Sequence, residues 1–313
     1  MSNNGIVYGL TGERSRGSLE DYHRKPKPLM LNKTKHAIDV SGLKKIEQRT
    51  NLKFDGEDYE SKFTIGFEVE KNEMSRSAIK EYELFCGFEK DGSCGYFASS
   101  SYGYEAVTHI LPLLPAGKWR TKVFDMMHKA EKIIDDRFSP SNGRCGGHIT
   151  IGVDGLSGED LRVLIAENSG IVLALFRHRL NNLYCGSNRR IQNRYDSTFN
   201  SSLSGGSYYY PSQRHYKYQV ALVKDDCLEF RLPSRFESVK QMMRRYELMY
   251  ELVDFSVNKP NGSHDAFLKR IKPIILSMYN GDENKVQIVF TLAKHFRSFI
   301  LKGKISPEIE RYL

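Results

Sequence analysis

Strict alternation of apolar and polar residues over residues 62–70 constrains the fold more than any other feature of this sequence. In Lys62-Phe-Thr-Ile-Gly-Phe-Glu-Val-Glu70 every second side chain is apolar. Successive side chains of a strand point to opposite faces, so the pattern predicts a strand with one apolar and one polar face. Similar alternation at residues 82–88, 147–153 and 228–232 predicts three more strands. We therefore expect a sheet with one face packed on helices and the other face open.

Helical periodicity separates these strands. Apolar residues recur at helical spacing in residues 121–138, 161–180, 238–258 and 284–301, and Ser157-Gly-Glu-Asp160 precedes the second of these as a capping box. Strands and helices do not alternate regularly along the chain. This irregular order favours an α+β fold with an antiparallel sheet over a doubly wound parallel fold.

The chain is predicted to have three parts. Residues 1–60 are polar and without sustained period, and we interpret them as an N-terminal extension; residues 61–260 form the core, and residues 261–313 a C-terminal helical cap. No apolar run approaches the roughly 20 residues of a membrane helix, and no signal-peptide pattern opens the sequence, so we expect a cytoplasmic protein without membrane contact. The five cysteines are widely spaced and lack a C-x-x-C pair, which predicts reduced thiols.

Positive charge is concentrated in one stretch. The net charge is +9, and residues 177–245 hold thirteen Lys and Arg against five Asp and Glu. This surplus predicts an anionic ligand there, although a solvated surface is the ordinary interpretation of any single charge. One hypothesis is therefore a nucleic-acid-binding protein that stacks bases on Tyr184, Tyr195 and the tyrosines at 208–210.

Ionisable residues share the polar face of the predicted strands. Glu68 and Glu70 are two apart, so their carboxylates would project from one face roughly 7 Å apart and could hold metal ions. Solvated glutamates are the ordinary alternative for such a pair. His148 has the same phase on its strand, Glu229 and Arg231 have it on theirs, and Glu105 is a further candidate. Several strands with this arrangement favour a common polar site.

Six short segments stand in a fixed order between residues 62 and 240. They are Gly66-Phe-Glu-Val-Glu70, Asp91-Gly-Ser93, Gly103-Tyr-Glu105 followed by Leu111-Pro112, Cys145-Gly-Gly-His-Ile-Thr-Ile-Gly152, Arg194-Tyr195 with Asn200, and Leu228-Glu-Phe-Arg-Leu232. Their order and spacing resemble the amidoligases of the glutamine-synthetase and glutamate-cysteine-ligase superfamily. One departure is Thr150, where the family often has a second histidine, and it affects the expected substrate or metal contact there.

The resemblance implies a curved antiparallel sheet with a glutamine-synthetase-like core that binds ATP and Mg²⁺. It implies a carboxylate–amine ligase, acting on small-molecule or peptide carboxylate and amine substrates through an acyl phosphate. It assigns the metal shell to Glu68, Glu70, Glu105, His148 and Glu229, nucleotide contacts to His148, Arg194 and Arg231, and catalysis to Arg231 and Glu70. A third hypothesis keeps this fold without catalysis, as a structural or interaction protein.

Overall fold

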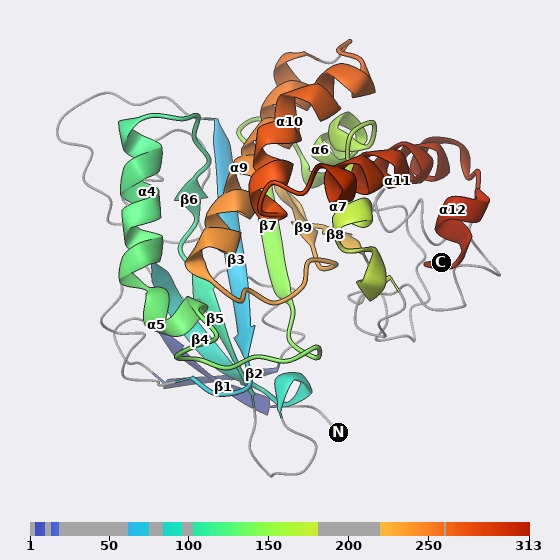
Figure 1. Ribbon diagram of the computed structural model, residues 1–313. Helices are drawn as coiled ribbons and strands as arrows, with labels where there is room; N and C mark the ends of the chain where they lie inside the picture. Colours follow the sequence, from blue (N-terminus) through green and yellow to red (C-terminus); the bar gives the residue numbers. More distant parts are fainter. Residues whose placement is uncertain are drawn as a thin grey trace. The chain divides into compact units, whose positions relative to one another are not determined.

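The structure, a computed structural model, describes seven stretches of the chain (Figure 1). These are residues 4–9, 14–18, 62–74, 84–95, 103–180, 220–259 and 261–313. The chain divides into two compact units: unit 1 comprises residues 1–149 and 234–243, and unit 2 comprises residues 150–233 and 244–313. The fold is mixed α+β with an antiparallel sheet, as predicted. The glutamine-synthetase-like core stays a prediction.

Unit 1 is built on an ordered set of strands. In sequence they are β1 (Asn4–Gly9), β2 (Arg14–Ser18), β3 (Phe63–Lys71), β4 (Phe85–Asp91), β5 (Gly103–Thr108), β6 (Leu111–Pro112) and the start of β7 (Gly147–Val153). Their order across the sheet is β2-β1-β4-β5-β3-β7, and β6 pairs with β3. The pairs β1–β2, β1–β4, β4–β5, β3–β5 and β3–β6 are antiparallel.

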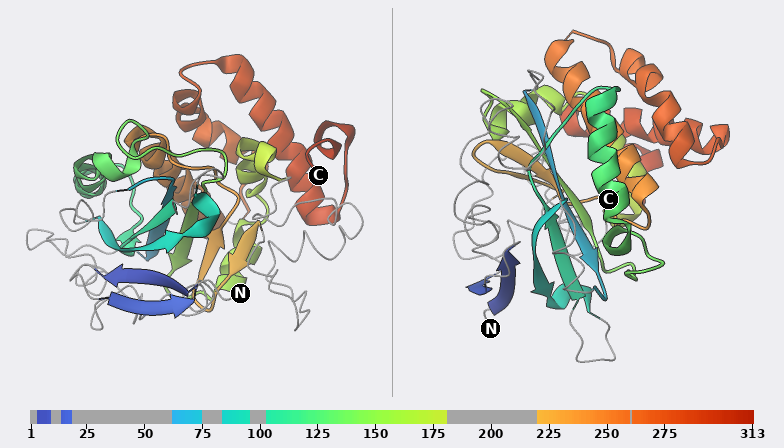
Figure 2. Two further views of the ribbon diagram at one scale, coloured as in Figure 1. Left: turned by 90° about the horizontal axis from the view of Figure 1, so that it is seen from below. Right: turned by 90° about the vertical axis from the view of Figure 1, so that its left-hand side faces the viewer.

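Two strands lie in the N-terminal segment, where the sequence shows no sustained alternation. β1 is six residues long and contains Gly5 and Gly9, so it offers too few side chains for a period of two to stand out. β1 pairs with both β2 and β4 and extends the unit 1 strands at one edge (Figure 2). Residues 19–61 lie outside the described part, and the predicted division at residues 60 and 260 stays a prediction.

The polar face of β3 is buried, which makes the expectation of an open sheet face wrong for this strand. Thr64 is 4% exposed, and Glu68 and Glu70 are each 6% exposed. The apolar face, with Phe67 and Val69, is buried as predicted. A strand buried on both faces places its carboxylates out of water, so they need hydrogen bonds or cations to remain charged.

Helices α4 (Lys118–Lys129) and α5 (Glu131–Ile134) lie on one side of the unit 1 strands (Figure 2). The sequence predicts one helix over residues 121–138, but the helix breaks at Ala130, whose φ and ψ are −89° and 13°. Val123, Met126 and Met127 of α4 are buried. The apolar periodicity thus predicts the buried Val123 and Met127 correctly, but it misses the break, and Phe138 at the end of the predicted helix is 53% exposed.

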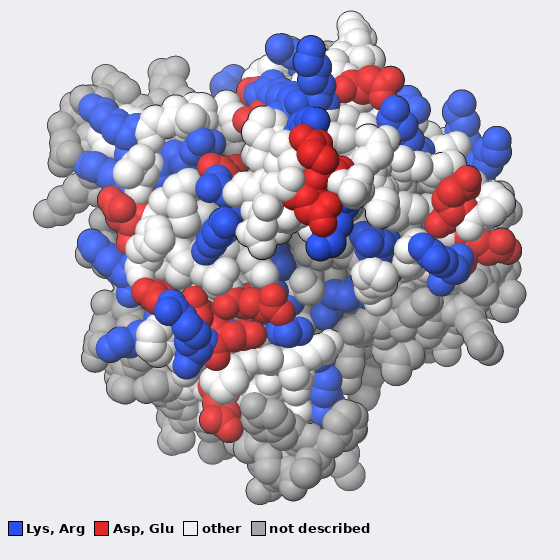
Figure 3. All heavy atoms as spheres, viewed as in Figure 1, with Lys and Arg blue, Asp and Glu red and all other residues white. Residues whose placement is uncertain are grey.

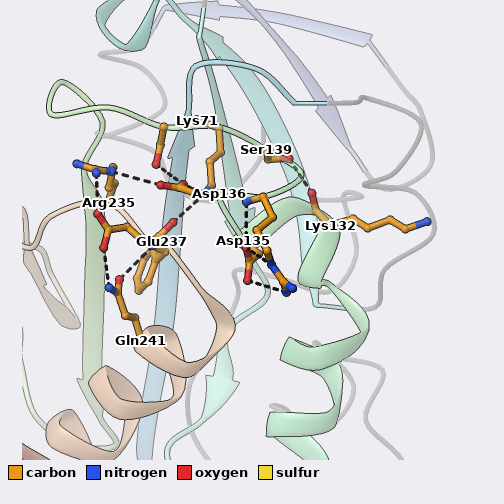
Figure 4. Close-up of polar contacts among 11 residues, drawn as sticks. Lys71, Lys132, Asp135, Asp136, Ser139, Arg235, Glu237 and Gln241 are labelled. Carbon is orange, nitrogen blue, oxygen red and sulfur yellow. Dashed lines mark hydrogen bonds and ion pairs between the residues drawn. The ribbon is translucent and has the colours of Figure 1, made fainter. Parts of the chain in front are cut away.

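A buried lysine joins β3 to the segment that returns to unit 1 at residues 234–243 (Figure 4). The Lys71 ammonium is fully buried and lies 2.7 Å from both Asp136 Oδ1 and the carbonyl oxygen of Phe236. Burial lowers the pKa of Lys71, and Asp136 opposes that effect. Arg235 pairs with Glu237, and Gln241 donates to Glu237. This network fixes residues 235–241 by polar contacts rather than by apolar packing alone.

Unit 2 is mainly helical. It contains α6 (Gly158–Ile165), α7 (Gly170–Leu175), the 3-10 turn η2 (Arg177–Arg179), β8 (Ala221–Val223), β9 (Cys227–Phe230), most of α9 (Val239–Asn258), α10 (His264–Met278), α11 (Glu283–Lys302) and α12 (Pro307–Glu310). β8 and β9 pair antiparallel. The predicted capping box is confirmed, because Ser157 Oγ accepts from the Asp160 N–H and Asp160 accepts from the Ser157 N–H.

The helix predicted over residues 161–180 is two helices and a turn. α6 ends at Ile165, and α7 begins at Gly170, against α11. A Cβ on Gly170 would lie 2.5 Å from the carbonyl oxygen of Ala293. Arg297 of α11 also forms an ion pair with Glu167, in the turn between α6 and α7. The break falls at Asn168-Ser169-Gly170, a local turn signal, and the close approach to α11 requires a glycine at its end. No helix in the described part of the chain is long and apolar enough to cross a membrane.

Candidate functional site

Acidic positions form a row across three neighbouring strands of unit 1. In the antiparallel register Glu70 of β3 stands opposite Glu105 of β5, and Glu105 stands opposite Glu89 of β4. Directly opposed residues of an antiparallel pair project from the same face. Glu70 and Glu105 are therefore brought together as predicted.

His148 of β7 lies between the two glutamates of β3. Its Nδ1 is 2.5 Å from Glu68 Oε2, and its Nε2 is 3.4 Å from Glu70 Oε1. All three side chains are at least nine-tenths buried. The structure thus brings together Glu68, Glu70 and His148 as the sequence predicts.

Two glycines of the Cys145-Gly-Gly-His148 segment leave room for this arrangement. The Gly146 N–H donates to Glu70 Oε2. A Cβ on Gly146 would lie 3.1 Å from His148 Nε2 and 3.2 Å from Glu70 Oε2, closer than side chains normally approach. A Cβ on Gly147 would lie 2.5 Å from the carbonyl oxygen of Ser234. The absence of a side chain at Gly146 therefore leaves room for Glu70 and His148. The absence of one at Gly147 allows the close approach of the backbone at Ser234.

A thiol occupies the other side of the Glu70 carboxylate. Cys94 Sγ lies 3.1 Å from Glu70 Oε2 and 3.3 Å from Asp91 Oδ2. Asp91 also accepts from the Ser93 N–H at 2.7 Å, which fixes the 3-10 turn η1 (Gly92–Cys94) at the end of β4. Asp91-Gly-Ser93 is one of the six segments of the resemblance, which assigns it no site role. Its contacts with Cys94 and Glu70 were missed because they depend on the meeting of β3, β4 and η1.

Cys145 forms a hydrogen bond with the Cys94 thiol. A hydrogen bond from Cys94 to Cys145 raises the pKa of Cys94, as do burial and the carboxylates of Glu70 and Asp91. The same hydrogen bond lowers the pKa of Cys145. Cys94, Cys145 and Cys227 are reduced thiols, as predicted, and burial raises the pKa of Cys227 to about 12. The raised pKa of Cys94 keeps its thiol protonated.

The carboxylates of this cluster have few cationic neighbours. Within the described residues, neither lysine nor arginine forms an ion pair with Glu68, Glu70 or Asp91. Their partners are instead an imidazole, a thiol, a hydroxyl and backbone N–H groups. Buried anions without cations are costly unless a proton or a metal ion compensates them. The cluster therefore has the composition of a cation site.

Glu229 and Arg231 belong to unit 2, where Glu229 contacts two basic side chains. Glu229 Oε1 is 2.5 Å from Arg231 Nη1, and its Oε2 is 2.5 Å from Lys224 Nζ. The sequence did not predict Lys224, which the β8–β9 connection carries. Thr150 is partly exposed on β7. Arg194 lies outside the described residues.

Several charges of the predicted basic stretch form ion pairs, including those of Lys224 and Arg231 with Glu229. Arg235 pairs with Glu237, and Arg244 pairs with Glu247. On the face shown in Figure 3 basic and acidic side chains of the described residues are interspersed. Residues 181–219, with the tyrosines proposed for base stacking, lie outside the described part.

Comparison with known proteins does not assign a family. The chain matches no model of a known protein family, and no curated protein sequence matches it significantly. The amidoligase resemblance therefore rests on the six short segments and stays a prediction.

Proposed function

We propose that this protein is an ATP- and Mg²⁺-dependent carboxylate–amine ligase that forms an amide or peptide bond. Two observations support the proposal: the resemblance of the six segments to the amidoligases, and the buried polar cluster of unit 1. Nucleic-acid binding is not proposed, because no contact of the described residues favours it.

The position of His148 carries the proposal. A neutral imidazole has one N–H, so it can donate to Glu68 or to Glu70 but not to both. In metal sites a ligating histidine commonly donates its second ring N–H to a carboxylate, which fixes the ring. Glu68 suits that role at Nδ1. His148 Nε2 and Glu70 Oε1 lie 3.4 Å apart, so both atoms could then coordinate one ion.

The donor set fits a hard divalent ion. Mg²⁺ prefers carboxylate oxygens and water, and Glu70 with the neighbouring Glu105 supplies the former. The imidazole nitrogen also suits a transition metal such as Mn²⁺. When bound, the metal would neutralise the charge that develops on the phosphoryl oxygens during transfer.

The protein's own residues would position the reactants. A substrate carboxylate attacks the γ-phosphorus, which yields an acyl phosphate and ADP; the amine then displaces phosphate and loses a proton. Arg231 is proposed to offer its planar fork of donors to the phosphoryl group, with Glu229 and Lys224 fixing the guanidinium. The resemblance adds Arg194 as a second anion contact.

The test is amine-dependent release of ADP. The full chain is incubated with Mg²⁺-ATP and a panel of amino acids, small peptides and polyamines with carboxylate donors, and products are identified by mass. Arg231→Lys should lower turnover at least about 100-fold, because a point charge cannot replace the bidentate fork. Arg137→Lys, at an exposed arginine of unit 1, is the matched control and should keep wild-type turnover.

The proposal fails if no amine in the panel increases ADP release. Retention of most of the turnover by Arg231→Lys would instead remove only the role of that arginine.

A further inference from the structure

We infer that Glu70, Asp91 and Cys94 form a second metal position in unit 1, one that binds a thiolate-preferring divalent ion such as Zn²⁺. The ligand atoms of these residues all lie within 4.8 Å of one another, and the side chains are at least nine-tenths buried. Ligands of one ion, each about 2.0–2.3 Å from it, are separated by distances of this order.

The two oxygens of Glu70 face different partners. Oε1 faces His148 Nε2, whereas Oε2 faces Cys94 Sγ and the Gly146 N–H. A carboxylate divided in this way can bridge two ions. The imidazole side presents nitrogen and oxygen donors, and the thiol side presents sulfur and oxygen. Soft sulfur selects zinc and related ions over Mg²⁺, so the two positions would differ in their metal.

Cys94 is not isolated at this position. Its thiol hydrogen-bonds to Cys145, which supplies a second sulfur beside the first. Gly103 of β5 makes the approach of Cys94 possible, because a Cβ at Gly103 would overlap the side chain and backbone of Cys94. A glycine at position 103 of β5 is therefore required for Cys94 to lie at this place.

An amide oxygen at the same place points to a bound ligand. Asn72 is 1% exposed, and its Nδ2 donates to the carbonyl oxygen of Cys94. Its Oδ1 is buried and has no hydrogen-bond partner among the described residues. Buried acceptors are almost always satisfied. A water molecule on the metal ion would donate to this oxygen and complete the coordination.

Binding of the ion releases one proton from the cluster. The Cys94 thiol has a single proton, so it can donate to only one of Glu70, Asp91 and Cys145 at a time. On binding, that proton leaves to solvent and the thiolate, Glu70 and Asp91 become ligands. The net charge of the cluster then falls in magnitude by one unit.

Co²⁺ titration of the full chain tests the inference. The protein is stripped with a chelator, kept reduced with a phosphine, and titrated with Co²⁺ without nucleotide. We expect a thiolate-to-Co²⁺ charge-transfer absorption that saturates near one ion per chain and is displaced by Zn²⁺. Cys94→Ser should abolish the absorption and lower Zn²⁺ affinity at least about 100-fold, more than the loss of an outer-shell partner does.

Two further variants keep the test decisive. Asp91→Asn keeps an acceptor for the Ser93 N–H, so the turn should fold, and we expect at least about 10-fold weaker Co²⁺ binding with the absorption retained at saturation. Cys227→Ser, at the described cysteine of unit 2, is the control and should match wild type. Co²⁺ binding without the absorption, or an unchanged absorption in Cys94→Ser, would overturn the inference.

This test is independent of the ligase proposal, although both use Glu70. An absorption without amine-dependent ADP release would overturn the ligase alone. Ligation without the absorption would overturn the thiolate position alone.

Discussion

Gly146 is the residue at which the backbone comes closest to the buried polar cluster. Gly146→Ala should shift the Glu70 carboxylate and the His148 ring by a few tenths of an ångström, because the new Cβ would lie 3.1–3.3 Å from both. We expect about 1 kcal/mol lower free energy of unfolding and about 10-fold weaker Mn²⁺ binding, measured by urea denaturation and by titration. Gly143→Ala is the control, since nothing lies within 4 Å of its Cβ. Equal Mn²⁺ affinity in the two variants would contradict the prediction.

The Lys71–Asp136 pair allows the contribution of each partner to be separated. Asp136→Asn removes the negative charge beside the buried ammonium, so it should lower the free energy of unfolding by about 3 kcal/mol. Lys71→Met removes the buried charge and keeps most of the volume, and Asp136 retains Arg235 and Ser141 as partners. We therefore expect a smaller loss from Lys71→Met. Urea denaturation of both variants measures the two losses. A larger loss from Lys71→Met than from Asp136→Asn would show that the salt bridge itself stabilises this part of unit 1.

At the scale of elements, the sequence predicted what local periodicity determines. β7 spans residues 147–153 as predicted, and α9 and α11 begin and end within one residue of their predicted bounds. β1 and β2 were missed because such short strands carry too few alternating side chains. The break between α6 and α7 was missed although Asn168-Ser169-Gly170 is a local turn signal, whereas the approach of Gly170 to α11 depends on residues far along the chain. Local sequence cannot signal a contact of that kind.

The α7–α11 contact yields a prediction in which helix propensity and packing disagree. Alanine favours a helix over glycine by about 1 kcal/mol, so propensity alone predicts that Gly170→Ala stabilises α7. The new Cβ would instead lie 2.5 Å from the Ala293 carbonyl oxygen and 2.8 Å from the Arg297 nitrogen. Backbone atoms cannot move aside cheaply, so we expect a net loss of about 2 kcal/mol. A higher melting temperature in calorimetry would show that α7 does not need this close approach.

At the scale of the whole molecule, the sequence predicted the carboxylates and imidazole of the cluster but not its sulfur side. Glu68, Glu70 and His148 follow from alternation within single strands, and Glu105 follows from weaker alternation together with the resemblance. Cys94 enters only through the turn after β4 and the absence of a side chain at Gly103. Residues that meet through register and tertiary approach leave no periodic signal, which is why the thiol was not predicted.

The dependence of stability on pH should be set in part by His264 of unit 2. Its Nδ1 lies 3.0 Å from Asn168 Oδ1, and burial with the nearby Arg297 lowers its pKa to about 4 from an ordinary 6.5. The unfolded chain binds the proton more tightly, so stability is full above pH 6.5 and falls as the pH drops toward 4. The loss should reach roughly 2 kcal/mol by pH 4.5.

His264→Gln cannot titrate and should flatten this part of the pH profile, measured by urea denaturation at a series of pH values. His128→Gln, at an exposed histidine of α4, should leave the slope unchanged. A slope that persists in His264→Gln would assign the dependence to other groups.

Divalent ions should stabilise the whole chain if the cluster of unit 1 binds them. Glu70 and Asp91 present carboxylate oxygens within 4.8 Å of each other, and at an effective dielectric near 20 two such charges repel by roughly 3 kcal/mol. An ion that binds only the folded state adds about 2.7 kcal/mol at 100 times its dissociation constant. We therefore expect Mg²⁺ or Mn²⁺ to raise the melting temperature by a few degrees.

Glu70→Gln should then change two measurements in opposite directions. Without metal it removes one of the repelling charges, so it should melt at or above the wild-type temperature. With metal it should lose the upward shift, because an amide oxygen is a weaker ligand than a carboxylate. Glu73→Gln, at an exposed position three residues along the chain, should keep the shift. Solvated, independent glutamates predict no metal-dependent shift in any of these proteins, and that result would leave the proposed ligase without the site on which its chemistry depends.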